Sequence, residues 1–121
     1  MNLITILKSK IHRATVTEAS LDYVGSITLD PALMEAANIL NNEKVLIADI
    51  TNGNRLETYA IRGDGKPGEV CINGAAAHLI NVGDLVLIMA FRTVPETKAD
   101  KFPATVLTVD EKNAVTSIKR K

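Results

Sequence analysis

The dipeptide Gly25-Ser26 is the first place in this sequence where backbone and side-chain chemistry could combine. It lies in the run 23–28, which otherwise has the composition of a β-strand. A glycine inside a strand pattern marks a bulge or a close backbone approach, and its carbonyl is not shielded by a side chain. The Ser26 hydroxyl could therefore attack the Gly25 carbonyl if the fold strained the bond between them. The alternative is an ordinary bend, where Gly-Ser is common.

A second group of candidates lies on the expected strand 55–62. Because side chains alternate between the two faces of a strand, Arg55 and Tyr59 point to one side and Thr58 to the other. A site that used all three side chains would have to enclose both sides of this strand. A closed barrel or a boundary between subunits could do so.

Lys10, His12 and Arg13 form a small basic group, for which a solvated strand end is the simplest interpretation. A metal site made of His12, Cys71 and His78 is a further alternative. These three residues lack the close spacing typical of metal ligands, and Cys71 lies in an apolar strand. We therefore expect no metal, and as the only cysteine Cys71 cannot form an intrachain disulfide.

The segment 73–78 begins with Asn73, Gly74, Ala75 and Ala76. It offers several backbone N–H groups surrounded by very small side chains, which would suit an anion or a polarised carbonyl. Close packing of one chain segment on another is the alternative. The glycine-rich loop 63–68 lacks the Gly-Lys-Ser/Thr sequence of a phosphate-binding loop, so we interpret it as a hairpin connection.

The composition indicates one globular domain of 121 residues, long enough to bury a core. Fourteen basic residues balance fourteen acidic ones, which argues against a broad surface for nucleic acid or an anionic membrane. No apolar run reaches the roughly 18 residues that a membrane-spanning helix needs, and the N-terminus lacks a signal pattern. We therefore expect a cytoplasmic protein.

Short strands separated by turns dominate the expected secondary structure. Asp30-Pro31 predicts the start of a helix, with Leu40 on its apolar face and an end at Asn41-Asn42. Asn52-Gly53 predicts a type I′ hairpin turn. Residues 17–20 are expected to form a turn and residues 119–121 a frayed end. The remaining strands are expected at 2–16, 44–51, 69–72, 85–91, 104–109 and 114–118. This pattern predicts a closed β-barrel with a small helical addition.

Taken together, these motifs resemble the bacterial pyruvoyl-dependent aspartate 1-decarboxylases. The resemblance covers about the first ninety residues. The matching stretches, in the family's order and separations, are Lys10-Ile11-His12-Arg13, Tyr23-Val24-Gly25-Ser26, Thr51-Asn52-Gly53, Arg55, Thr58-Tyr59 and Asn73-Gly74-Ala75-Ala76-Ala77.

The resemblance implies a mainly β fold, a double-psi β-barrel with one or two short helices, spanning 1–121 as a single domain. It also implies a homotetramer with active sites between subunits. The chain would cut itself into a β chain (1–25) and an α chain (26–121), and Ser26 would become a covalent pyruvoyl group. That group would form a Schiff base with L-aspartate and release CO2 and β-alanine for pantothenate and coenzyme A synthesis. The sequence does not specify whether maturation needs a helper protein.

The same resemblance implies roles for the individual residues. Thr58 would donate a hydrogen bond to the oxyanion formed during cleavage at Gly25-Ser26, and Tyr59 would protonate the substrate carbon. Arg55 and Lys10 would bind the substrate carboxylates. The other residues of the pocket are Asn73, Gly74, Ala75 and Ala76 around the pyruvoyl group, with His12 and Tyr23 as surrounding residues.

Two other functions stay open on the sequence. The chain could be a β-barrel binding or assembly module in which Gly25-Ser26 stays intact. It could also be a pyruvoyl decarboxylase for another amino acid, although Arg55 and Lys10 favour a dicarboxylic one.

Overall fold

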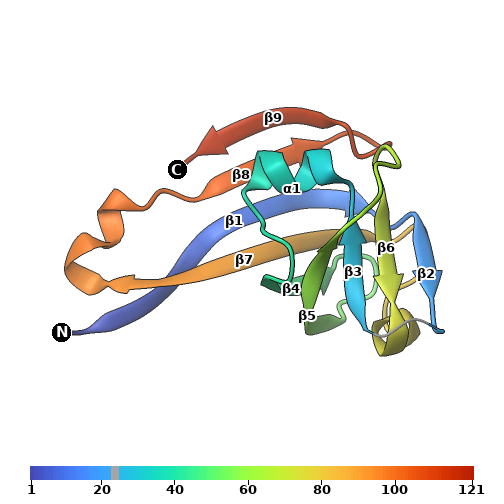
Figure 1. The fold of residues 1–121 in the computed structure, drawn as a ribbon, viewed down its shortest axis with the longest axis horizontal. Coiled ribbons are helices and arrows are strands. Elements are labelled where there is room, and N and C mark those ends of the chain that lie inside the picture. The colour runs from blue at the N-terminus through green and yellow to red at the C-terminus, as the bar shows by residue number, and fades with distance from the viewer. Residues whose placement is uncertain (23–24) are drawn as a thin grey trace.

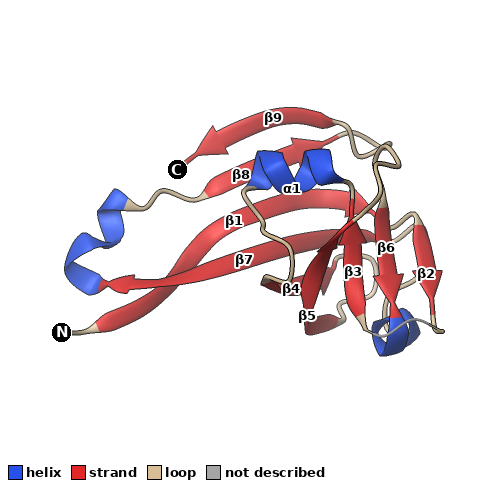
Figure 2. Cartoon of the chain, in the orientation of Figure 1, coloured by secondary structure: helices blue, strands red, loops and turns tan. Residues whose placement is uncertain are grey.

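The computed structural model of this chain describes residues 1–22 and 25–121. Strands make up about half of the chain, and the helices are short (Figure 2). The strands are β1 (Leu3–Thr15), β2 (Glu18–Ser20), β3 (Ser26–Leu29), β4 (Lys44–Asp49), β5 (Arg55–Arg62), β6 (Val70–Asn73), β7 (Leu85–Pro95), β8 (Thr105–Val109) and β9 (Val115–Arg120). The helices are α1 (Pro31–Ala37) and the 3₁₀-helices η1 (Gly74–His78) and η2 (Glu96–Lys101).

The sheet closes on itself through the junction between β1 and β2. Its strand order is β2-β6-β3-β5-β4-β7-β1-β8-β9. The first seven strands in this order begin with β2 and end with β1, and only Val16 and Thr17 separate these two strands along the chain. The Val16 N–H donates to the Asp84 carbonyl and the Thr17 N–H to the Val70 carbonyl, each at 2.9 Å. These seven strands therefore form a barrel, as the sequence predicts.

The barrel mixes parallel and antiparallel pairs. Strands β3 and β5 pair in parallel, as do β2 and β6 and also β1 and β8, whereas the other pairs are antiparallel. Parallel neighbours require long crossovers, so segments far apart in sequence meet. Figure 1 shows the result, with β2, β6, β3 and β5 side by side at one end of the molecule and β1 and β7 extending away from them.

Aliphatic side chains fill the barrel, as the near absence of aromatic residues predicts. In β4 and β7 the buried side chains occupy every second position, so the pattern of burial follows the pleat. The fully buried side chains include Ile11, Ile27, Leu29, Ile47, Ile72, Ile88 and Leu107. Burial of one such side chain stabilises a fold by about 1.5–3 kcal/mol.

Helix α1 begins where the sequence predicts and ends earlier than expected. The Asp30 carboxylate accepts a hydrogen bond from the Ala32 N–H at 2.9 Å, and Pro31 occupies the first turn. Asn38 then takes a left-handed conformation (φ +58°), which ends the helix. The predicted end at Asn41-Asn42 is therefore wrong, and Leu40 is 63% exposed rather than part of the apolar face.

Two local predictions fail because distant contacts or side chains decide the backbone. Residues 17–20 do not form a turn, because Glu18–Ser20 form β2 by pairing in parallel with β6. The Asn52-Gly53 turn is not type I′. That turn type needs a positive φ at both residues, but only Gly53 has one (φ +82°), and the φ of Asn52 is not positive. Instead the Asp49 carboxylate accepts hydrogen bonds from the next loop residues, Thr51 and Asn52.

The C-terminal residues are paired rather than frayed. Lys119 lies opposite Val106 and Arg120 opposite Thr105 in the β8–β9 ladder. The Lys121 N–H also donates to the Ala104 carbonyl at 2.9 Å. Among the described residues, no helix has the length and apolar character needed to cross a membrane.

Candidate active site

Strand β3 brings Ser26 into a block of polar side chains. In the antiparallel β3–β6 pair, Ser26 lies opposite Asn73 and Thr28 opposite Cys71. Since side chains alternate, these four residues share one face of the pair, while Ile27, between Ser26 and Thr28, points into the core. The register therefore gathers four polar groups from two strands separated by more than forty residues.

Strand β5 completes the pocket on the other side of β3. Ile27 lies opposite Ala60 and Thr28 opposite Ile61, which places Tyr59 beside Ser26. Together the strands enclose a pocket of about 440 Å³. Its lining residues are Glu18, Ser26, Thr28, Tyr59, Ile61, Lys66, Glu69, Cys71 and Asn73.

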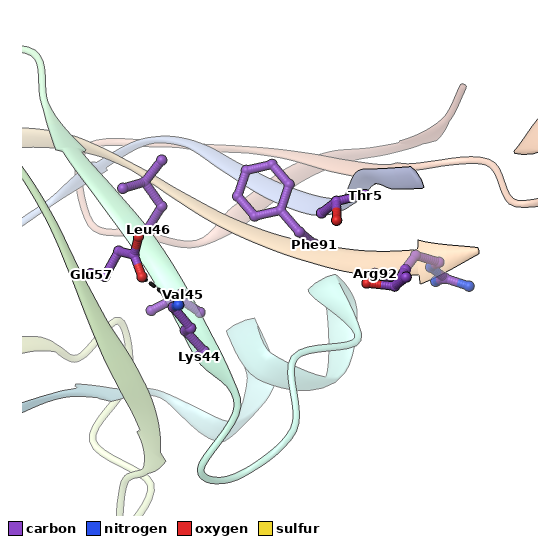
Figure 3. Close-up of a pocket in the computed structure, with 8 residues that line it drawn as sticks. Thr5, Lys44, Val45, Leu46, Glu57, Phe91 and Arg92 are labelled. Atoms are coloured by element: carbon purple, nitrogen blue, oxygen red, sulfur yellow. Dashed lines mark ion pairs between the residues drawn. The ribbon is translucent and has the colours of Figure 1, made fainter. Parts of the chain in front are cut away.

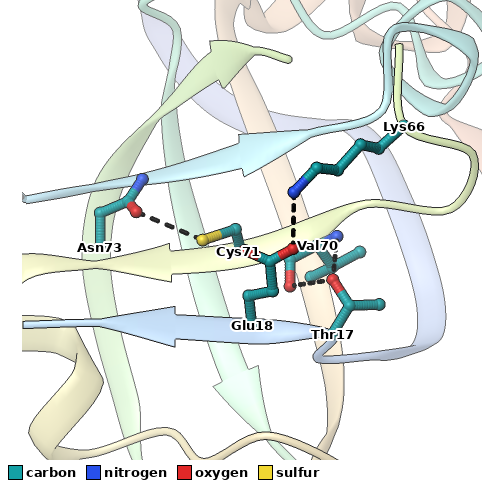
Figure 4. Close-up of polar contacts among 6 residues, drawn as sticks. All are labelled: Thr17, Glu18, Lys66, Val70, Cys71 and Asn73. Carbon is teal, nitrogen blue, oxygen red and sulfur yellow. Dashed lines mark hydrogen bonds and ion pairs between the residues drawn. The ribbon is translucent and has the colours of Figure 1, made fainter. Parts of the chain in front are cut away.

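A chain of hydrogen bonds runs through this pocket. The Asn73 Nδ2 group donates to Ser26 Oγ at 2.8 Å and to Thr28 Oγ1 at 2.9 Å. The Cys71 thiol donates to Asn73 Oδ1 at 3.3 Å (Figure 4). Ser26 is only 2% exposed, so its hydroxyl lies in a setting that the protein rather than bulk water controls.

Charged side chains line the same pocket near Cys71. Lys66 Nζ lies 2.9 Å from Glu18 Oε1, and this contact raises the pKa of Lys66 (Figure 4). Burial raises the pKa of the Glu69 carboxyl group. Burial also raises the pKa of the Cys71 thiol, and the carboxylates of Glu18 and Glu69 raise it further. The thiol is therefore held in its protonated form.

Thr58 lies on the other side of β5 from Tyr59, next to the bond before Ser26. It shares a second pocket of about 270 Å³ with Gly25 and with Ala75 and Ala76 of η1. A Cβ atom added to Gly25 would come no closer than 4.0 Å to the Asn73 carbonyl oxygen, which is ordinary contact. Space alone therefore does not demand glycine at this position.

Arg55 and Lys10 lie apart from Ser26 within one chain. Arg55 is exposed, pairs with Ala48 of β4, and precedes Tyr59 by four residues, or about 13 Å along the strand. Lys10 is half-buried on β1, and β5, β4 and β7 lie between this strand and β3 in the sheet. Neither residue is among those that line the Ser26 pocket.

His12 also lies outside the Ser26 pocket. It lines a separate one with Arg13 and Thr108, and burial, with the charges of Lys10 and Arg13, lowers its pKa. Within 1–22 and 25–121, no cluster of three or more His, Cys, Asp and Glu side chains is arranged to hold a metal ion. Tyr23 lies outside the described residues.

A further cavity of about 360 Å³ lies between β4, β5 and β7, away from Ser26 (Figure 3). Lys44 and Glu57 form an ion pair at its edge. Leu46 and Phe91 contribute apolar surface. None of its lining residues also lines the Ser26 pocket, so this cavity offers that site no additional group.

Comparison with known proteins decides the family to which this arrangement belongs. The family model described as aspartate decarboxylase matches residues 1–116. The chain belongs to the aspartate decarboxylase family. The resemblance inferred from the motifs is thereby confirmed, as is the predicted enzyme class, a decarboxylase and hence a carbon–carbon lyase. The fold class is confirmed as far as this aspartate decarboxylase family member is mainly β, a barrel with short helices.

Curated relatives match almost the whole chain. An aspartate 1-decarboxylase from Acetivibrio thermocellus is 56% identical over 116 residues, covering 96% of this chain and 92% of the relative. One from Clostridium botulinum is 58% identical over 112 residues, covering 93% and 88%. One from Corynebacterium efficiens is 54% identical over 114 residues, covering 94% and 84%. The crystal structure of the rationally designed mkDPBB_sym1 protein aligns with 72% of this chain and 99% of its own, at 14% identity and a TM-score of 0.48.

Sequence reasoning missed several residues that line the pocket of this aspartate decarboxylase family member. Thr28 was not a candidate, and Cys71 was considered only as a metal ligand, although each lies two residues from a predicted pocket residue, Ser26 and Asn73 respectively. The period of two along a strand is the signal that could have found them. Lys66 offered no such signal, since it reaches the pocket from a loop.

Proposed function

We propose that this chain decarboxylates L-aspartate to β-alanine and CO2 in the cytoplasm, as a step of pantothenate and coenzyme A synthesis. The reaction would use a pyruvoyl group made from Ser26. The position of Ser26 is the observation that supports this most directly. It follows an unshielded glycine carbonyl, is almost fully buried, and accepts a hydrogen bond from Asn73 beside Tyr59. Family membership and the names of the relatives support the same substrate.

Maturation would begin when Ser26 Oγ bonds to the Gly25 carbonyl carbon. The peptide C–N bond breaks, and the hydroxyl proton passes to the freed nitrogen, which leaves an ester. Elimination then removes the Cα proton of residue 26, breaks its Cβ–Oγ bond and forms a Cα=Cβ double bond, which releases the Gly25 carboxylate and leaves dehydroalanine. Water adds and ammonia leaves, which converts position 26 to a keto group. Thr58, beside Gly25, would donate to the oxyanion of the first step, and loss of such a donor costs about 100-fold or more in rate.

The residues around position 26 fit a keto group. A keto oxygen only accepts hydrogen bonds, and the Asn73 amide already donates toward Ser26. Ala75 and Ala76 leave room beside Gly25. A pyruvoyl group would supply the electron sink for the electron pair released with CO2.

Substrate binding would need a neighbouring copy of the chain. Neither Arg55 nor Lys10 lines the Ser26 pocket of its own chain. We therefore propose a homotetramer in which Arg55 and Lys10 of one subunit hold the aspartate carboxylates in the Ser26 pocket of the next. Arginine suits this task because its planar group binds a carboxylate through two parallel hydrogen bonds. Tyr59, in the pocket itself, would protonate the α-carbon.

The intact mass of the denatured protein tests this proposal. Wild-type protein should give two fragments divided after Gly25, and the larger should react with a hydrazine. Ser26→Ala should stay whole and produce no β-alanine from L-aspartate. Ser117→Ala, the same change on remote β9, should cut and turn over normally. A wild-type chain that stays whole and inert to hydrazine would instead indicate a binding module or an unmatured precursor, and activity in Ser26→Ala would refute the assignment.

A further inference from the structure

We propose that Cys71 is a positioning residue whose thiol holds the Asn73 amide with its N–H groups toward position 26. The inference deepens the proposed function and rests on it. It comes from the hydrogen-bond chain from Cys71 through Asn73 to Ser26 and Thr28.

The two hydroxyl groups cannot decide the orientation of the Asn73 amide. A hydroxyl can both donate and accept, so Ser26 and Thr28 would satisfy either the N–H or the oxygen side of the amide. The third neighbour is Cys71, whose S–H donates to Asn73 Oδ1 at 3.3 Å. Its sulfur is only a weak acceptor, so a thiol that donates to the amide oxygen favours the orientation in which the N–H groups point toward position 26.

Burial makes this contact matter. Asn73 and Cys71 are each only 5% exposed, so a lost partner is not readily replaced by bulk water. The groups facing Cys71 come from three segments. They are Glu18 of β2, Lys66 and Glu69 of the loop before β6, and Thr28 of β3. Burial and the two carboxylates keep the thiol protonated against the smaller opposing effect of Lys66. The sulfur is therefore a donor.

The orientation matters before and after cleavage. Before cleavage, the Asn73 N–H leaves the Ser26 hydroxyl proton free to move to the peptide nitrogen. After cleavage, position 26 carries an oxygen that can only accept. A reversed amide would set the Asn73 oxygen against that oxygen, and two acceptors repel. The thiol would thus favour both maturation and turnover without touching the substrate.

Three substitutions separate hydrogen bonding from packing. Cys71→Ser keeps a donor but is smaller, Cys71→Val keeps the volume but has no donor, and Cys71→Ala keeps neither. We expect the valine and alanine variants to cut after Gly25 about fivefold to tenfold more slowly, as the loss of one buried hydrogen bond would give. Their mature fractions should show a kcat lowered to a similar extent with KM changed less than about twofold. The serine hydroxyl can donate to Asn73 Oδ1 but can also accept from the amide, so the serine variant should lie between wild type and the alanine variant in both measurements.

The cleavage rate is measured by intact mass against time, so it does not depend on the activity of matured protein. Thermal midpoints of all four proteins show whether any variant is merely unfolded. A valine variant that cuts at the wild-type rate, or a serine variant as slow as alanine, would overturn the role of Cys71. A wild-type chain that never cuts would instead overturn the proposed function, so the two failures are distinguishable.

Discussion

Replacing Asn113 with alanine should destabilise the barrel more than almost any other polar substitution. Asn113 lies between β8 and β9, is 2% exposed, and has φ +63°. Its side chain accepts from the Thr15 N–H and donates to the carbonyls of Thr15 and Gly68, each at 2.8 Å. One amide thus ties the end of β1 to the loop that carries Lys66 over the Ser26 pocket.

The expected cost follows from these contacts. Three hydrogen bonds at about 1 kcal/mol each give about 3 kcal/mol. Alanine in the left-handed region adds about 1 kcal/mol. The sum of about 4 kcal/mol is a large share of the 5–15 kcal/mol that stabilises a typical domain.

Urea unfolding followed by circular dichroism measures this cost. The Ser26→Ala background keeps every chain whole, and a fixed protein concentration removes the effect of assembly. Asn42→Ala is the matched control, because Asn42 is exposed with φ +69° and changes mainly the backbone preference. We expect about 1 kcal/mol for Asn42→Ala and about 4 kcal/mol for Asn113→Ala. Equal losses in the two variants would refute the assignment of stability to the side-chain contacts.

Two further predictions concern the site and the pH dependence of stability. Tyr59→Phe should mature normally, because Thr58 rather than Tyr59 lies beside Gly25, yet its kcat should fall by about 100-fold; turnover equal to wild type would remove Tyr59 from its role. Burial, and then a hydrogen bond to Asp84, raises the pKa of Asp49, so the folded state holds a proton that the unfolded state has released. Stability should therefore fall as the pH rises from the unfolded pKa of 3.8 through the raised folded value. Asp49→Asn should flatten this fall in urea unfolding measured across that pH range, and an unchanged slope would contradict the reasoning.

Strongly local signals predict the elements that the structure confirms. Strand β5 has the predicted bounds, because a turn precedes it and the glycine-rich loop 63–68 follows it. The start of α1 is correct, because Asp30 and Pro31 act on their own neighbours. The end of α1 is not, because Asn38, Asn41 and Asn42 could each end a helix in the left-handed conformation, and local sequence does not decide which of them does.

Non-local pairing explains most of what the sequence could not predict. Strand β2 exists only because β6 lies beside it, more than fifty residues later in the chain. The same holds for the pocket, since the β3–β6 register places Cys71 and Thr28 around the predicted residues Ser26 and Asn73. Family resemblance identified Ser26 and Asn73 as candidates, but the contacts that orient them depend on strand pairing that only the folded structure shows.

The position of Gly25 in the sheet has a thermodynamic consequence for a severed chain. The piece ending at Gly25 contains β1, which is bonded along one edge to β7 and along the other to β8, together with β2. Such a fragment would remain paired within the sheet, so cleavage would leave the folded architecture unchanged. Cleavage would change the unfolded state, because two separate chains must then associate before the protein can refold. Maturation would thus convert a protein that refolds as a single chain into one whose refolding requires two chains to associate. Heat inactivation should therefore be far harder to reverse afterward.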